Sequence, residues 1–505
     1  MQIETFWQHW QITENPFRAE EARDDPVLRR LMEAQNTHPD FPKIYGQGDQ
    51  PSSAVVFGEK GSGKSGLRLA VERRVALYNE RHPEARILLV QYTDFDYFLE
   101  QMRRSAHLSA DPERGAEEVV AAWRLADHLD AFLSLAVTRL VDELIQQRKA
   151  PRALTRQQRF DLLWLASLYY SSKRTSTADA LRRARSILHY RSARPGTQRL
   201  GMLALAALGV ALCLVPLWNE LEIGPTWESG PAVPWLVGGG VALAAAGVWA
   251  AVERVRVRSA ARRATRGVRV LARDPLPAAA LLETLRPGAR KEVAMPTGTG
   301  EATRYHLLQR LLAVLEPCGY ACMYVVVDRV DESTLLAGSE EWTRRFAEKL
   351  LDHKLLQHPG LALKLFLPIE LAKMYLGASP EQLKRMRLDK SNTLQELRWT
   401  GQELYEVANQ RLRAARSDGE ATGRCDLAGF FREDLPREEL LDTLHELGTP
   451  RHAFGFLSTL FSEYARNLPE DLEEEAPEWR VPRAHFDVVR SAWADRSRVL
   501  RRALN

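Results

Sequence analysis

Residues Ala54–Ser65 read AVVFGEKGSGKS, and no other part of this 505-residue chain says as much about its architecture. The apolar run Ala54–Phe57 predicts a short buried strand, and a helix is expected from Ser65 to about Glu80. Between them, Gly58–Ser65 matches the spacing G-x4-G-K-[ST]. Glycines at these positions let the backbone curl until successive N–H groups point to one place, where a helix N-terminus also favours negative charge. The stretch therefore predicts a phosphate-binding loop between a strand and a helix.

This loop supplies the candidate nucleotide ligands. Lys64 is expected to bridge the β- and γ-phosphates of a nucleoside triphosphate, and the Ser65 hydroxyl to take a ligand position on Mg²⁺. A chance glycine-rich turn is the alternative, but a strand before the turn and a helix after it are the context that a P-loop requires. The candidate binding residues are Gly58, Glu59, Lys60, Gly61, Ser62, Gly63, Lys64 and Ser65.

A second motif, VVVDRVDE at Val325–Glu332, supplies candidate acids. Its apolar residues predict a buried strand, at whose carboxyl end Asp328 can hold Mg²⁺ directly or through water. Glu332, or with less support Asp331, is placed to orient or deprotonate an attacking water. The alternative for this segment is a buried strand that ends in solvated acids, and the glycine-rich loop elsewhere in the chain weighs against it.

Further apolar runs extend the pattern of strands. They predict strands at Ile87–Val90, Met323–Val327 and Leu361–Leu367, with a weaker one at Thr393–Leu397. Strand, helix and strand at this spacing favour a parallel α/β sheet. The region after residue 400 is expected to be helical, because Thr400 and Glu403 form a capping-box pattern and Thr449 precedes Pro450 as N-cap and first helical residue.

The middle of the chain interrupts the sheet pattern. Residues 117–147 and 156–190 carry apolar side chains at helical spacing. Two uncharged runs follow, Leu200–Trp218 and Trp235–Val252, and each is about long enough to cross the hydrocarbon core of a bilayer as a helix. A pair of buried core helices is the alternative.

Charges around the two uncharged runs favour the membrane interpretation. The arginines outside the runs are Arg182, Arg183, Arg185, Arg191, Arg194 and Arg199 on one side, and Arg254, Arg256, Arg258, Arg262, Arg263 and Arg266 on the other. The charged residues between the runs are Glu220, Glu222 and Glu228. This is the positive-inside pattern, which predicts a hairpin in the cell (inner) membrane with both termini and the sheet domain in the cytoplasm. Trp218 and Trp235 suit the outer interface, and Gly240 and Ala244 would let two helices approach closely.

The net charge and the cysteines of the chain bear on two further kinds of site. The net charge of +4, from 70 basic and 66 acidic residues, gives no basis for inferring nucleic-acid binding. Cys318 and Cys322 lack the second ligand pair of a zinc site, so free, buried thiols are expected for these and for Cys213 and Cys425.

The two motifs together resemble the AAA+/STAND side of the P-loop ATPases, whose second motif often reads as an apolar run followed by D-x-x-D-E. Membrane helices inserted between the motifs are similar to the KAP family of P-loop NTPases, and Asn15-Pro16-Phe17 resembles a segment of ATPases of the same broad group. The resemblance implies an ASCE/AAA+-like P-loop fold with a helical C-terminal lid. It also implies that the ligands are ATP and Mg²⁺ and that the chain is an ATPase.

The same resemblance implies roles for three arginines. Arg451, at the head of a late helix, is the candidate for the lid arginine that reaches the γ-phosphate, and Arg385 and Arg387 are candidates for an arginine finger. Exposed helix faces are the alternative for all three. The strand ending at Phe366–Pro368 lacks the polar residue that such ATPases carry there, which predicts slow turnover.

Together these features predict a membrane-anchored ATPase that drives assembly or a conformational switch, with a role in signalling or antiphage defence implied by the resemblance. Expected partners are the lipid bilayer, further copies of the chain and another protein. The rival interpretations are an ATP-triggered oligomeric pore and a nucleotide-binding scaffold without turnover. The expected segments are 1–100 and 301–400 for the nucleotide domain, 101–198 for a helical insertion, 199–252 for the hairpin, 253–300 for a basic linker and 401–505 for the lid.

Overall fold

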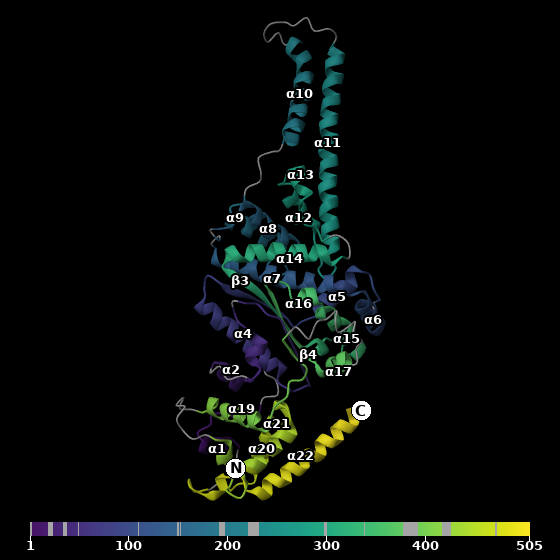
Figure 1. Ribbon diagram of the computed structural model, residues 1–505. Coiled ribbons are helices and arrows are strands. Elements are labelled where there is room, and N and C mark those ends of the chain that lie inside the picture. Colours follow the sequence, from purple (N-terminus) through teal and green to yellow (C-terminus); the bar gives the residue numbers. More distant parts are fainter. Residues whose placement is uncertain are drawn as a thin grey trace. The chain divides into compact units, whose positions relative to one another are not determined.

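The computed structural model of the chain is drawn in Figure 1. It describes residues 3–18, 24–33, 38–48, 50–109, 111–148, 151, 153–190, 197–220, 232–296, 300–337, 339–376, 392–416, 426–469 and 472–504. The chain forms two compact units, the first made of Met1–Phe95 and Tyr320–Asn505 and the second of Asp96–Gly319. The first unit is therefore assembled from two separate parts of the sequence.

The first unit contains a five-stranded parallel sheet with the order β2-β3-β4-β1-β5. The strands are β1 (Ala54–Gly58), β2 (Arg86–Tyr92), β3 (Tyr320–Val327), β4 (Leu361–Pro368) and β5 (Asn392–Leu394). The predicted mixed α/β fold with a parallel sheet is confirmed. The last strand is shorter than predicted, ending at Leu394, although the Leu397 N–H still donates to the Phe57 carbonyl of β1 at 2.7 Å.

The register of the sheet brings the ends of its central strands together. Gly58 pairs with Pro368, and Val327 pairs with Leu365, so β1, β3 and β4 finish at one edge. All residues of β4 are buried, as expected for a parallel strand covered on both faces. The segments that follow Gly58, Val327 and Pro368 therefore begin close to one another.

Helices cover this sheet. Helix α4 (Lys64–Arg81) follows β1 directly and buries Leu67, Val71 and Val75 in one core with strand residues such as Val56. Shorter helices in the same part of the first unit as the sheet are α3 (Phe41–Tyr45), α15 (Glu340–Glu348), α16 (His353–Leu356) and α17 (Ile369–Leu376).

A second core in the first unit is helical. Its helices are α1 (Ile3–His9), α2 (Pro26–Glu33), α19 (Gly401–Ala414), α20 (Arg437–Leu447), α21 (Pro450–Arg466) and α22 (Arg483–Leu504). The predicted helix starts are confirmed: Thr400 and Glu403 form a capping box, and the Thr449 side chain accepts from the backbone of His452 with Pro450 in the first turn. Because each cap satisfies an N–H that the helix leaves without a partner, it fixes where the helix begins.

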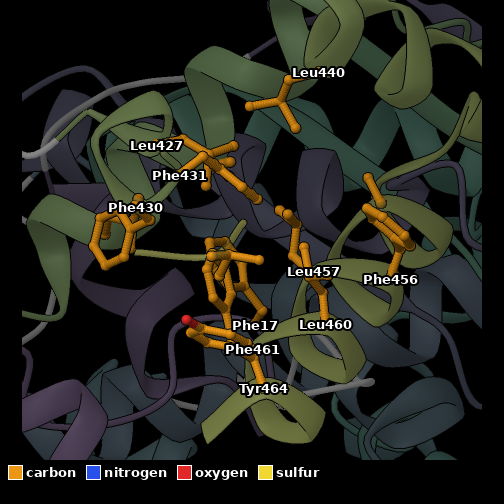
Figure 2. Packing of buried hydrophobic residues seen from close by; sticks show 14 of the residues in the cluster. Phe17, Leu427, Phe430, Phe431, Leu440, Phe456, Leu457, Leu460, Phe461 and Tyr464 are labelled. Atoms are coloured by element: carbon orange, nitrogen blue, oxygen red, sulfur yellow. The ribbon is translucent and has the colours of Figure 1, made fainter. Parts of the chain in front are cut away.

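The N-terminal segment completes this helical core, as Figure 2 shows for Phe17 beside Phe461. The Phe17 ring stacks on Phe454 and Phe461, with centroids 5.9 and 6.1 Å away. The Arg411 guanidinium donates to the Pro16 carbonyl at 2.6 Å, and the Asn15 amide donates to the Ser458 hydroxyl at 3.3 Å. The Asn-Pro-Phe segment is therefore a structural element of the C-terminal helices.

The second unit is all helical in its described residues. Apart from the two long apolar helices, its α-helices are α5 (Asp96–Ser105), α6 (Pro112–Ala122), α7 (Leu125–Gln147), α8 (Arg156–Tyr169), α9 (Thr177–Ile187), α12 (Pro275–Leu282), α13 (Pro287–Arg290) and α14 (Glu301–Leu315). Each predicted helical stretch is thus divided once, at Trp123 and after Tyr169. Asp130 is fully buried on α7, where it pairs with Arg304 of α14 and accepts from the Tyr169 hydroxyl at 2.8 Å.

The apolar helices α10 (Thr197–Glu220) and α11 (Ala232–Gly267) lie side by side (Figure 1). Both are long and apolar enough to cross a membrane. Only 6% of Leu200–Trp218 is buried, which counts against the alternative of buried core helices. The predicted close approach at Gly240 and Ala244 is wrong for this pair, since nothing lies within 4 Å of a Cβ placed on Gly240.

The two helices approach each other closely at Gly239, one residue before Gly240. A Cβ on Gly239 would lie 2.7 Å from the Gly209 carbonyl oxygen and 2.4 Å from the Cys213 sulfur. These glycines let the backbones come together without a side chain between them. The face that carries Gly240 and Ala244 stays exposed.

Candidate functional site

The loop after β1 has a conformation that only glycine adopts readily. Gly61 and Gly63 have φ of 89° and 95°, in the left-handed region where a Cβ would meet the backbone. A Cβ on Gly61 would also lie 2.7 Å from the Cβ of Arg451. The Ser62 hydroxyl is buried with no hydrogen-bond partner among the described residues. The loop therefore forms a tight backbone cradle that leads into the N-terminus of α4.

Lys64 lies across this cradle. Its ammonium donates to the carbonyls of Gly58 at 2.6 Å and Glu59 at 2.9 Å. Burial lowers the pKa of Lys64, and the negative charges of Asp331, Asp328 and Glu370 oppose that shift. The lysine thus sits among acids from the segments that follow β3 and β4.

Asp328 follows β3 and is almost fully buried, with 1% of its surface exposed. The Ser65 hydroxyl donates to one of its carboxylate oxygens at 2.9 Å. Within the described ranges no group of three or more His, Cys, Asp or Glu side chains converges as a metal site. A site with one carboxylate and one hydroxyl nonetheless fits Mg²⁺, because this ion is usually held by one or two protein oxygens together with phosphates and waters.

Arg68, one turn into α4, binds the same carboxylate. Its Nε donates to Asp328 at 3.1 Å, and its Nη1 pairs with Glu72. The Arg68 side chain is only 6% exposed, so this is a buried ion pair that fixes the Asp328 rotamer. Sequence reasoning missed Arg68. The available signal was its position three residues after Ser65, which places both on one face of α4.

The two acids after Asp328 differ in their surroundings. Arg329 has a left-handed φ of 64°, and the short 3₁₀ helix Val330–Glu332 follows it. Glu332 is 52% exposed at its side chain and pairs with Arg329 at 3.3 Å. Asp331, rather than Glu332, is the acid whose charge acts on Lys64.

The segment before α19 and the start of α21 also contact the glycine-rich loop. The Arg451 N–H, at the start of α21, donates to the Gly61 carbonyl at 3.3 Å, and the Arg451 charge acts on Lys64. The Trp399 indole N–H donates to the Ser62 carbonyl at 2.7 Å, and its ring lies 3.4 Å from a Cβ placed on Gly63. The loop is therefore held by direct contacts from the segment before α19 and from α21.

The structure brings most of the predicted site residues together. The loop Gly58–Ser65, Asp328, Asp331 and Arg451 gather around Lys64, while Glu332 turns toward Arg329. The predicted Arg385 and Arg387 lie outside the described residues. Besides Arg68, sequence reasoning missed Trp399 and Glu370. Glu370 lies two residues beyond β4, where the sequence ends its apolar run.

No protein-family model, curated protein or solved structure matches this chain. The function is therefore argued from the geometry of its own residues.

Proposed function

We propose that this chain is a membrane-anchored nucleoside triphosphatase of the P-loop type that uses ATP. The observation that carries the proposal is that Lys64 and Ser65, at the end of the glycine-rich loop, lie beside Asp328 at the carboxyl edge of the parallel sheet. A loop with N–H groups free to converge, followed by a helix N-terminus and a lysine, is the arrangement that binds phosphates in such proteins. ATP is preferred to GTP on the resemblance alone.

The residues of the cradle have distinct proposed roles. Lys64 would exchange its two carbonyl acceptors for phosphate oxygens, and charge-assisted bonds of this kind are stronger than the neutral ones they replace. Mg²⁺ held by Ser65 and Asp328 would supply positive charge on the phosphates. The Arg451 backbone N–H and side-chain carbons lie against Gly61, so its guanidinium would sense whether the cradle is filled.

Hydrolysis needs a base that orients or deprotonates water, and Glu332 and Asp331 are the candidates. Asp331 acts on Lys64, whereas Glu332 is tied to Arg329. The Arg329–Glu332 pair favours a second candidate function, a nucleotide-binding scaffold with little turnover, because Glu332 must leave it before acting on water. The apolar end of β4 supports the same alternative.

The apolar helices α10 and α11 would anchor the protein in a bilayer, since both carry many large apolar side chains that are exposed. Nucleotide binding would then drive assembly with further copies or a conformational switch at the membrane. A role in signalling or antiphage defence stays a prediction from the resemblance.

Equilibrium binding of a fluorescent ATP analogue to the detergent-solubilised full chain tests the site. Lys64→Ala should abolish measurable binding, since the ammonium and its bonds to the phosphates are lost. Lys354→Ala is the matched control, because Lys354 is an exposed lysine of α16. Unchanged affinity in Lys64→Ala would remove the proposed nucleotide site.

A further inference from the structure

Helix α11 continues well beyond its apolar run. At about 1.5 Å per residue, its 36 residues extend roughly 54 Å, whereas a hydrocarbon core is about 30 Å thick. The surplus follows Val252 and carries many arginines. The near arginines (Arg254, Arg256 and Arg258) begin about 3 Å past Val252, and the far arginines (Arg262, Arg263 and Arg266) begin about 15 Å past it.

Several other arginines of the second unit have an acidic partner on their own helix. On α5, Arg103 and Arg104 both pair with Glu100, and on α9 Arg182 pairs with Asp179. The near and far arginines are all exposed, and no guanidinium group among them has a hydrogen bond or an ion pair with the residues that the structure describes. The single acid of this stretch, Glu253, pairs with Arg290.

The packing of α11 explains why the arginines point outward. Its buried residues in this stretch are Val257, Ala261, Ala264 and Thr265, along the side that contacts α12 and its neighbours. The other sides of α11 in this stretch are exposed, and the near arginines lie on them. Guanidinium groups without an acidic partner are expected to bind anions from outside the chain.

The depth of the near arginines identifies the anion. The headgroup layer on each side of a bilayer is about 5–8 Å thick, which follows from total and hydrocarbon thicknesses. If the run that ends at Val252 spans the core, the near arginines fall within this layer or just beyond it, and long side chains reach back toward it. The far arginines lie about 15–21 Å beyond the core, so they are about 7–16 Å outside the headgroup layer, where salt screens much of their attraction to the phosphates.

We propose that the near arginines form a binding site for anionic phospholipid headgroups, such as phosphatidylglycerol, in the leaflet that faces the second unit. This rests on the proposed membrane insertion and goes beyond it, because an anchor alone requires no particular headgroup. Each basic residue near a charged membrane surface strengthens lipid binding by about fivefold. The arginines would thus tie the position of α11 to lipid composition.

The test compares lipid association with the full chain reconstituted in phosphatidylcholine membranes. Trace spin-labelled phosphatidylglycerol or phosphatidylcholine reports the motionally restricted lipid at the protein surface. Wild type should prefer phosphatidylglycerol. Changing all near arginines to Gln should lower that preference at least fivefold. Changing all far arginines to Gln removes the same charge from the same helix and should leave the preference within twofold of wild type, as should changing the near arginines to Lys.

Other outcomes overturn the proposal. Equal association of both lipids with wild type, or equal losses in the near and far variants, would mean that no local headgroup site exists. Displacement of the labelled lipid by excess inorganic phosphate would indicate a site for free anions, and displacement by a single-stranded oligonucleotide would reassign the surface to nucleic acid. If neither lipid shows a restricted component, membrane insertion itself is wrong. Should the full Gln variants fold poorly, Arg256→Gln and Arg263→Gln make the same comparison with a smaller change.

Discussion

Glu332 and Asp331 are neighbours in the sequence, but their carboxylates have different surroundings. Glu332 is paired with Arg329 and half exposed, while the charge of Asp331 acts on Lys64. A general base typically contributes about a hundred- to ten-thousand-fold to a rate. Replacing the acid that acts as the base with its isosteric amide should therefore slow hydrolysis measurably.

We expect Glu332→Gln to slow ATP hydrolysis by about a hundredfold or more while leaving nucleotide affinity intact, because Lys64, Ser65 and Asp328 remain. A phosphate-release assay with the full chain measures the rate, and Asp331→Asn is the matched control. If Asp331→Asn is the more damaging change, the two roles are exchanged. If wild type itself has no measurable turnover, the scaffold interpretation replaces the enzyme.

Single residues also mark the limit of what the sequence predicts. The loop, Asp328 and Arg451 were predictable because each belongs to a recognisable local pattern. Trp399 was not predictable, because its partner Ser62 lies 337 positions away. For Arg68 the place beside Ser65 on α4 was predictable, but its pairing with Asp328, 260 positions away, was not. The pairing of distant residues depends on the whole fold, which no local pattern contains.

Among the elements, β4 holds an unusual side chain in its interior. The Lys364 ammonium is fully buried and donates to the carbonyls of Ile44, Tyr45 and Ser52 at 2.8, 2.9 and 2.6 Å. Burial lowers the pKa of Lys364 from 10.5 to about 7. The lysine ties the segment before β1 to the middle of the sheet.

This pKa makes the stability of the first unit depend on pH. Between pH 7 and 10.5 the unfolded chain binds more protons at this lysine than the folded chain, so stability should rise with pH in that range. Lys364→Met should flatten the rise, measured as the thermal unfolding midpoint in detergent from pH 7 to about 8.5, below the unperturbed pKa of Cys322 near 9.0. Parallel curves for wild type and variant would show that the three carbonyls keep Lys364 charged throughout.

The apolar helices allow a prediction of topology. A cysteine introduced at Asn219 should react with a membrane-impermeant thiol reagent outside intact cells, whereas one at Arg258 should react only after lysis. The native cysteines would first be changed to Ser. The reverse pattern of labelling would mean that the hairpin has the opposite orientation in the membrane. Equal reactivity at both positions in intact cells would count against insertion.

Elements were easier to predict than their arrangement. Strand positions and the caps at Thr400 and Thr449 follow from local sequence, and the structure confirms them. The break at Trp123 was missed because apolar residues continue across it. The break after Tyr169 was missed although the polar run Ser171–Thr177 marks it and Ser176 caps the next helix. Strand order was also beyond reach, since pairing in a parallel sheet is set by contacts between distant segments.

At the scale of the whole molecule, the two ends of the chain share one hydrophobic core. Phe17 is 2% exposed and packs against α21, the helix that begins with Pro450 and Arg451. Residues near the start of the sequence therefore support the helix that contacts the glycine-rich loop.

Phe17→Ala should lower the free energy of unfolding by about 3–5 kcal/mol, the range for truncating a buried aromatic ring. Chemical denaturation of the first unit, followed by tryptophan fluorescence in detergent, measures the change. Val488→Ala is the control, because Val488 is 66% exposed on α22 and should change stability by less than about 0.5 kcal/mol. A wild-type midpoint for Phe17→Ala would contradict the packing in Figure 2.

The union of the two chain ends also has a consequence during translation. The Thr13 hydroxyl bonds to the Ala415 carbonyl 402 positions later, and Asn15 bonds to Ser458 443 positions later. At roughly 5–20 residues per second, a ribosome needs about 20–90 s to make that much chain. Throughout this interval Phe6, Trp7 and Phe17 have emerged without the helices that bury them. These apolar side chains must therefore stay exposed to water while the apolar helices α10 and α11 are made, long before the helices that bury them.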